Sequence, residues 1–68
     1  MKITFDRKAD AVYIYLKEAK VVNTLELDNS TYADYDKKGR VIGIEMLGAS
    51  QRISIEKLSK VVKIEHLA

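Results

Sequence analysis

Alternating apolar and polar positions dominate the first two-thirds of the chain, and a period of two residues is typical of half-buried β-strands. The clearest case follows Asp10, where valine, isoleucine and leucine alternate with alanine and tyrosine up to Lys17. β-Branched and aromatic side chains of this kind suit a pleated surface. The alternation predicts strands at Lys2–Phe5, Ala11–Lys17, Val21–Leu27, Thr31–Asp36 and Val41–Leu47.

Polar, turn-forming residues separate these segments. Asp6 and Asp10 flank the first turn, where both carboxylates are able to accept hydrogen bonds from nearby backbone amides. The run from Asp36 to Gly39 has the chemistry of a type I turn closed by a glycine bulge, because glycine reaches a positive φ without a Cβ clash. We therefore expect antiparallel hairpins.

The turn at Gly39 also fixes a register for its hairpin. The predicted pairs are Tyr35–Val41, Asp34–Ile42, Ala33–Gly43 and Tyr32–Ile44. One face of the hairpin then carries Ala33, Tyr35, Val41 and Gly43, and the other carries Tyr32, Asp34, Ile42, Ile44 and Met46. Neither face is purely polar, so we expect both faces of the sheet to need cover.

The tail after Gly48 fits two structures. Ser54 suits a helix N-cap, and the apolar residues of the next two turns recur at helical spacing, which predicts a helix on the sheet. Residues 61–67 also alternate, and β-branched side chains weaken a helix, so a helix of about two turns followed by a short strand is the alternative. The expected fold is α+β and mostly β: an antiparallel β-hairpin meander of about five strands with one short C-terminal helix, where the tail could instead add a strand.

Chain length limits the core. At 68 residues the protein is one small domain, and a domain of this size buries little apolar surface. There is no cysteine, which excludes disulfides and thiolate metal sites. Self-association is the remaining way to add buried surface. Because a single helix cannot cover two partly apolar faces, we expect a homodimer.

Charge and hydropathy narrow the class of protein further. The net charge is +2, with 12 basic and 10 acidic residues interspersed, whereas a dedicated nucleic-acid binder usually has a basic stripe. No apolar run approaches the roughly 20 residues that span a bilayer. Met1 to Asp6 has no apolar core of a signal peptide, so we expect a cytoplasmic protein.

We find no catalytic, cofactor or metal motif. Asp34 and Asp36 faintly resemble a calcium loop, but lysines take the place of the next oxygen ligand. Asp34 is also the best candidate for a general acid, because it is predicted beside Ile42 in mid-strand, yet no second carboxylate pairs with it. His66 is the only histidine and has no evident partner, so we expect a protein that is not an enzyme.

Two sets of surface residues are candidates for binding. Tyr13, Tyr15 and Tyr32 are the candidate partner surface, because tyrosine supplies contact area with a polar tip; ordinary packing and base stacking are the alternatives. The candidate nucleic-acid contacts are the basic residues of the predicted hairpin tips, Arg7, Lys8, Lys37, Lys38 and Arg40. Solvation of turn residues explains those tips more simply.

The segments Thr4 to Leu16 (TFDRKADAVYIYL) and Ala33 to Leu47 (ADYDKKGRVIGIEML) resemble a small prokaryotic family catalogued as domain of unknown function 2283. The resemblance covers about residues 2–52 and leaves the tail outside. It implies a compact β-hairpin domain of bacterial or archaeal origin, and no reaction. It also implies an antitoxin-like or partner-binding role, since genes of some members of the family lie beside small toxin-like genes.

The shared residues are those that turns and strands require. Asp6, Asp10, Asp36 and Gly39 shape hairpins, and Gly43 permits close packing beneath an aromatic ring. The sequence thus favours an interaction module that acts as a homodimer and binds another small protein, and the family resemblance adds an antitoxin-like role. The alternative is a weak nucleic-acid-binding protein that uses the basic hairpin tips.

Overall fold

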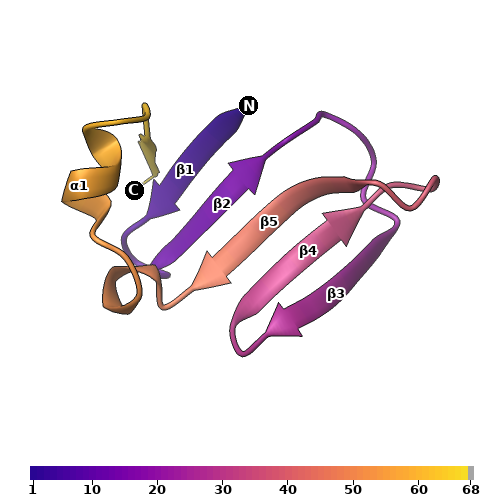
Figure 1. The fold of residues 1–68 in the computed structure, drawn as a ribbon, viewed down its shortest axis with the longest axis horizontal. Helices are drawn as coiled ribbons and strands as arrows, with labels where there is room; N and C mark the ends of the chain where they lie inside the picture. Colours follow the sequence, from indigo (N-terminus) through magenta and orange to yellow (C-terminus); the bar gives the residue numbers. More distant parts are fainter. Residues whose placement is uncertain (68) are drawn as a thin grey trace.

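Six strands form one open, mixed sheet in the order β3-β4-β5-β2-β1-β6 (Figure 1). The computed structural model describes residues 1–67. The strands are β1 (Lys2–Asp6), β2 (Ala11–Tyr15), β3 (Asn23–Asp28), β4 (Thr31–Tyr35), β5 (Val41–Leu47) and β6 (Glu65–Leu67). A 3-10 turn, η1 (Ala49–Gln51), and one helix, α1 (Ile55–Ser59), complete the chain. The prediction of a mostly β, α+β fold is confirmed.

The strand order is more complex than the predicted meander. β1 and β2 form one hairpin, and β3, β4 and β5 form a meander, but β5 lies between β4 and β2. Ile14 of β2 is opposite Ile44 of β5. The connection from β2 to β3 begins along β5, because the amides of Leu16 and Lys17 both donate to the Ile42 carbonyl at 2.9 and 3.2 Å.

The predicted register of the β4–β5 hairpin is correct next to the turn and wrong beyond it. Gly39 has a φ of 78° and Tyr35 lies opposite Val41, as predicted. A bulge then makes Ile42 an extra residue, so that Asp34 lies opposite Gly43 and Ala33 opposite Ile44. The predicted division of the hairpin into two faces is wrong for the same reason, because one extra residue moves every later side chain to the other face.

The corrected register sorts the sheet into two different faces. The core face carries an apolar row that crosses five strands, Leu25, Ala33, Ile44, Ile14 and Ile3, and a second row of Met46, Val12 and Phe5. The opposite, tyrosine face carries the rows Tyr32, Glu45, Tyr13, Thr4 and Asp34, Gly43, Tyr15, Lys2. Only the core face is strongly apolar.

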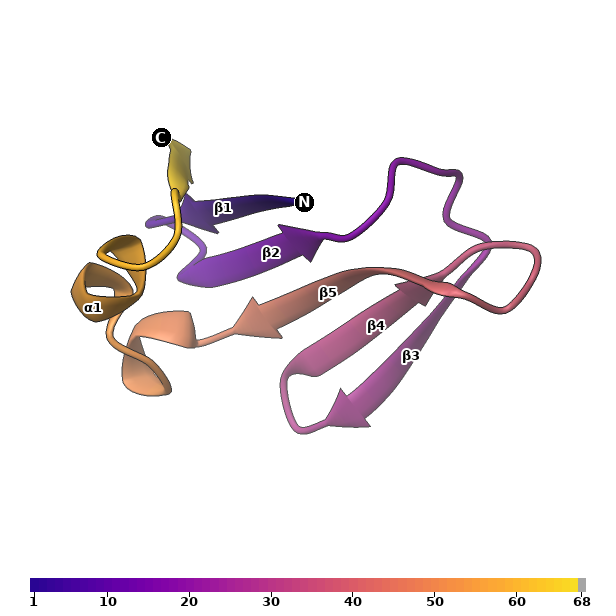
Figure 2. The same cartoon turned by 45° about the horizontal axis from the view of Figure 1, so that its top comes forward.

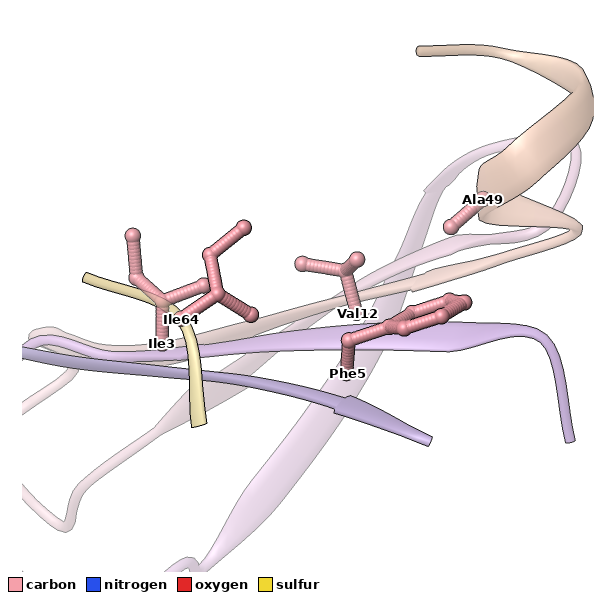
Figure 3. Close-up of a cluster of buried hydrophobic side chains, with 5 residues drawn as sticks. All are labelled: Ile3, Phe5, Val12, Ala49 and Ile64. Carbon is pink, nitrogen blue, oxygen red and sulfur yellow. The ribbon is translucent and has the colours of Figure 1, made fainter. Parts of the chain in front are cut away.

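The hydrophobic core lies at one end of the core face. Ile3, Phe5 and Val12 point to the same side of the sheet, where they meet Ala49 and Ile64 (Figure 3). Partly buried residues of the tail pack against this cluster: Ile53, Ile55, Leu58 and Val62. The tail therefore covers the core over β1 and β2.

The tail adopts the alternative predicted structure, a short helix followed by a strand. Ser54 is the N-cap, and its hydroxyl accepts a hydrogen bond from the Lys57 amide at 3.2 Å. The helix ends at Ser59, and the β-branched residues that follow lead into β6, which pairs with β1 in parallel. A three-residue strand at the edge of the sheet takes the place of the last helical turns.

Hydrogen bonds to Asp10 link the tail to the first hairpin. Its carboxylate accepts hydrogen bonds from the Ser50 amide at 2.9 Å and the Ser50 hydroxyl at 2.8 Å, and its carbonyl accepts one from the Ala49 amide. The predicted local role is confirmed for Asp6, which accepts from the amides of Lys8 and Ala9. For Asp10 it is wrong, because the bonded residue is 40 positions away.

Among residues 1–67, no helix covers the other end of the core face (Figure 2). Figure 2 shows α1 beside β1 and β2, and no helix over β3 or β4. Leu25, Leu27 and Val41 in this region are 51%, 54% and 39% exposed, compared with 2% for Val12. We call these three residues the open patch. The sequence prediction that both faces need cover is thus wrong for the tyrosine face, but part of the core face does lack it.

Candidate functional site

The register brings the three predicted partner-surface tyrosines to one face of the sheet. Tyr13 and Tyr15 belong to β2, and their ring centroids are 4.3 Å apart. Tyr32 of β4 lies opposite Glu45, which in turn lies opposite Tyr13. Tyr35 is also in β4, but it is an odd number of residues from Tyr32, so its side chain belongs to the core face. The tyrosine face is therefore a continuous aromatic and polar surface.

A hydroxyl–carboxylate network holds the centre of this face. The Tyr13 hydroxyl donates to Oδ2 of Asp34, and the Thr24 hydroxyl donates to Oδ1 of Asp34 at 2.6 Å. The Tyr13 ring crosses above Gly43, where a Cβ would stand only 2.7 Å from the ring Cζ. Gly43 thus packs beneath an aromatic ring, as the sequence predicts. The network links β2, β4 and β3 across β5.

The network favours a structural role for Asp34. The bulge places Asp34 opposite Gly43, so its predicted position beside Ile42 is wrong. Both carboxylate oxygens accept hydrogen bonds from neighbouring side chains. Burial raises the pKa of Tyr13, and the hydrogen bond and negative charge of Asp34 raise this pKa further. The Tyr13 phenol therefore stays protonated at neutral pH and cannot serve as a base.

Alkaline titration tests this network. We expect a tyrosine ionisation well above the ordinary pKa of 10.0, followed by near-ultraviolet absorbance, and we expect it to vanish in Tyr13→Phe. Because the folded-state pKa is raised, the stabilisation is complete below about pH 10 and is lost as the pH rises above it. Tyr15→Phe is the matched control. A high-pH step that survives in Tyr13→Phe would contradict the assignment.

The candidate nucleic-acid residues do not form one surface. Arg7 and Lys8 lie in the β1–β2 turn, whereas Lys37, Lys38 and Arg40 lie at or beside the β4–β5 turn. Figure 1 shows these two turns at opposite ends of the sheet. The longest dimension of the molecule is 35 Å.

The β4–β5 turn is nevertheless a well-defined basic site. Lys20, from the β2–β3 connection, joins Lys37, Lys38 and Arg40 around a hollow of about 350 Å³. Sequence reasoning missed Lys20, because only the strand order brings the two segments together. Asp36 organises the turn: it accepts hydrogen bonds from the Lys38 and Arg40 amides at 2.9 and 3.0 Å, and from Arg40 Nε at 3.0 Å. The bond from the Arg40 amide, together with the others, lowers the pKa of the Asp36 carboxyl.

Three further features of the described residues bear on function: the metal-ligating side chains, the His66 ring and the length of the helix. Among residues 1–67, no group of three or more His, Cys, Asp and Glu side chains is arranged to hold a metal ion. The His66 ring packs edge-on against Phe5, with centroids 5.9 Å apart, so it takes part in packing. Within the same described residues, no helix has the length and apolar character needed to cross a membrane.

Comparison with known proteins gives a match to a family profile and a match to an uncharacterized protein. Residues 2–50 match the sequence profile of a family described as protein of unknown function (DUF2283). An uncharacterized protein of Methanocaldococcus jannaschii is 37% identical over 68 residues. The match covers 96% of this chain and 58% of that protein. The chain thus spans just over half the length of this relative. No solved structure matches the chain significantly.

Proposed function

We propose that this chain, which belongs to the DUF2283 family, works through a surface, as a protein-interaction module that acts as a homodimer. The observation that carries the proposal is the open patch. Leu25, Leu27 and Val41 expose apolar side chains on or beside the uncovered end of the core face. A second copy supplies the missing cover.

The small core supports this choice of occupant. The buried apolar residues of residues 1–67 are Ile3, Phe5, Val12, Ala33, Ile42, Ala49 and Ile64, and two of these are alanines. A core of this size stabilises a domain only marginally, and the chain has no cysteine that could add a disulfide. Dimerisation adds apolar burial where the single chain lacks it.

The position of the open patch supports a symmetric arrangement. β3 lies at the edge of the sheet and is exposed along its whole length. Two copies related by a two-fold axis would pack the uncovered ends of their core faces against each other, with Leu25 of one copy beside Leu25 of the other. This face-to-face contact would also cover Leu27 and Val41.

Substitution in the open patch tests the dimer. Leu25→Lys is expected to raise the dimer dissociation constant about 30-fold or more, because it places two cations at the axis of an apolar contact. Leu25 is half exposed in the single chain, so the fold should survive. The measurement is sedimentation equilibrium, and circular dichroism checks the fold.

Val61→Lys is the matched control, since Val61 is 77% exposed and lies between α1 and β6, outside the open patch. We expect no change in its dissociation constant. Equal weakening by both variants would show that added charge, and not the patch, controls association.

An antitoxin-like role is the more specific form of the proposal, in which the dimer binds another small protein through the tyrosine face. That face lies opposite the open patch and stays free in the dimer. A stoichiometric partner from the native cell should bind wild-type protein and Leu25→Lys, and should be lost from Tyr15→Ser/Tyr32→Ser. Retention of the partner by this double variant would place the partner surface elsewhere.

Weak nucleic-acid binding is the alternative, and only the β4–β5 end of the molecule favours it. Its affinity should fall steeply with salt, because phosphate contacts release counterions. A flat response to salt would end this alternative.

A further inference from the structure

The hollow between the β2–β3 connection and the β4–β5 turn is a second surface feature, and the residues that line it belong to neither the open patch nor the tyrosine face. We propose that this hollow binds a phosphate group, held by Lys20, Lys37, Lys38 and Arg40. Its volume of about 350 Å³ falls within the range of roughly 300–1,000 Å³ for small-molecule sites. The proposal does not depend on the dimer.

Charge is concentrated at this hollow. Four cationic side chains and the Asp36 carboxylate line it, which gives a local charge of +3, more than the +2 of the whole chain. Within residues 1–67 the three lysines form no ion pair. Arg40 is paired through Nε with Asp36, which leaves its terminal nitrogens free of any hydrogen bond in the described chain. Four cations that share a single counter-charge repel one another, and a bound anion relieves that repulsion.

The scaffold beneath these side chains is ordered by hydrogen bonds. The Asp36 carboxylate accepts hydrogen bonds from two backbone amides of the turn and from Arg40 Nε. The Gly39 amide closes the turn, because it donates to the Asp36 carbonyl at 3.0 Å. The Val22 amide donates to the Tyr35 carbonyl at 2.9 Å, which fixes the β2–β3 connection beside the turn. The two basic segments are therefore held together without a ligand, as a binding site requires.

The chemistry of the donors favours phosphate over a single carboxylate. A phosphate carries more than one negative charge and several acceptor oxygens, which suit a ring of separate cations. Asp36 is the one negative group in the hollow, and its oxygens already accept the turn amides and Arg40. Val22 adds an apolar wall that the organic part of a phosphate ester can contact. A phosphate of this kind comes either from a small compound or from a nucleic-acid backbone.

Titration with pyrophosphate at low ionic strength, followed by amide NMR shifts, tests the site. We expect shift changes confined to residues 19–22 and 36–40. Removing one lysine by Lys20→Gln, Lys37→Gln or Lys38→Gln should weaken binding about fivefold, the effect of a single charge contact near a surface. The triple variant should lose binding.

The double variant Arg7→Gln/Lys8→Gln is the matched control, because it removes two charges at the opposite end of the sheet. Its affinity for pyrophosphate should equal that of the wild type. Equal weakening in the control, or shift changes spread over the molecule, would overturn the proposal and assign the binding to net charge alone.

A second titration with an oligothymidylate distinguishes the two phosphate sources. Tighter binding than pyrophosphate, through the same amides and lost in the triple lysine variant, assigns the phosphate to a nucleic-acid backbone. Binding of pyrophosphate but not of the oligonucleotide assigns it to a small phosphate compound. Absence of binding by both probes would overturn the proposal.

Discussion

Gly43→Ala is expected to destabilise the domain by about 1–3 kcal/mol, the usual cost of overpacking a filled site. The added Cβ would stand 2.7 Å from Cζ and 2.8 Å from Cε1 of Tyr13. The ring is not free to move aside, because its hydroxyl donates to Asp34 and the ring contacts the tilted Tyr15 ring, with centroids 4.3 Å apart. Relieving the clash therefore breaks the network that joins three strands. Urea unfolding at fixed protein concentration measures the loss.

A double-mutant cycle isolates the cause of this loss. The three atoms nearest the new Cβ all belong to Tyr13. In a Tyr13→Ala background, Gly43→Ala should thus cost less than about 0.5 kcal/mol, since residues in contact are not additive. A cost that is undiminished without the ring would mean that the glycine is needed for its backbone and not for the close packing.

Phe5→Ala should have a still larger effect, about 3–5 kcal/mol. Phe5 is 8% exposed and belongs to the one buried cluster, where it packs with Val12 and Ala49. A domain of 68 residues has a total stability of about 3–10 kcal/mol, so this variant should lose at least about a third of it, and it should unfold at room temperature if the total lies at the lower end. Circular dichroism and amide NMR dispersion measure the folded fraction.

Val61→Ala is the control for the core substitution. Val61 is 77% exposed, and its truncation should change the free energy of unfolding by less than about 0.5 kcal/mol. If Phe5→Ala remained folded with a similar small loss, the cluster of Figure 3 would not be the core that stabilises the domain.

Local patterns were enough to predict most of the strands, because each depends on residues close in sequence. The alternation around Val12, the turn at Gly39 and the N-cap at Ser54 all form as expected. The register beyond Tyr35 was wrong because nothing local marks Ile42 as an extra residue. The insertion of β5 between β4 and β2 and the 40-residue link from Asp10 to Ser50 depend on long-range packing, which periodicity does not contain.

The candidate site was predictable to a similar degree. The alternation alone places Tyr13 and Tyr15 on one face, and the structure adds Tyr32. The sequence predicts that Gly43 packs beneath an aromatic ring. It does not predict that the hydroxyl of that ring, Tyr13, donates a hydrogen bond to Asp34. Lys20 was missed because its place beside Lys37 requires the strand order. Of the residues through which the sequence resembles the family, Asp6, Asp36 and Gly39 shape turns and Gly43 allows close packing, whereas Asp10 binds the tail.

The mass of the wild-type protein in solution tests the central claim most directly. Sedimentation equilibrium at micromolar concentrations should give about 15 kDa, twice the 7.7 kDa of one chain, and this mass should fall towards that of the single chain on dilution. A mass of 7.7 kDa at every concentration would contradict the homodimer, and the open patch would then be an ordinary exposed part of a monomer.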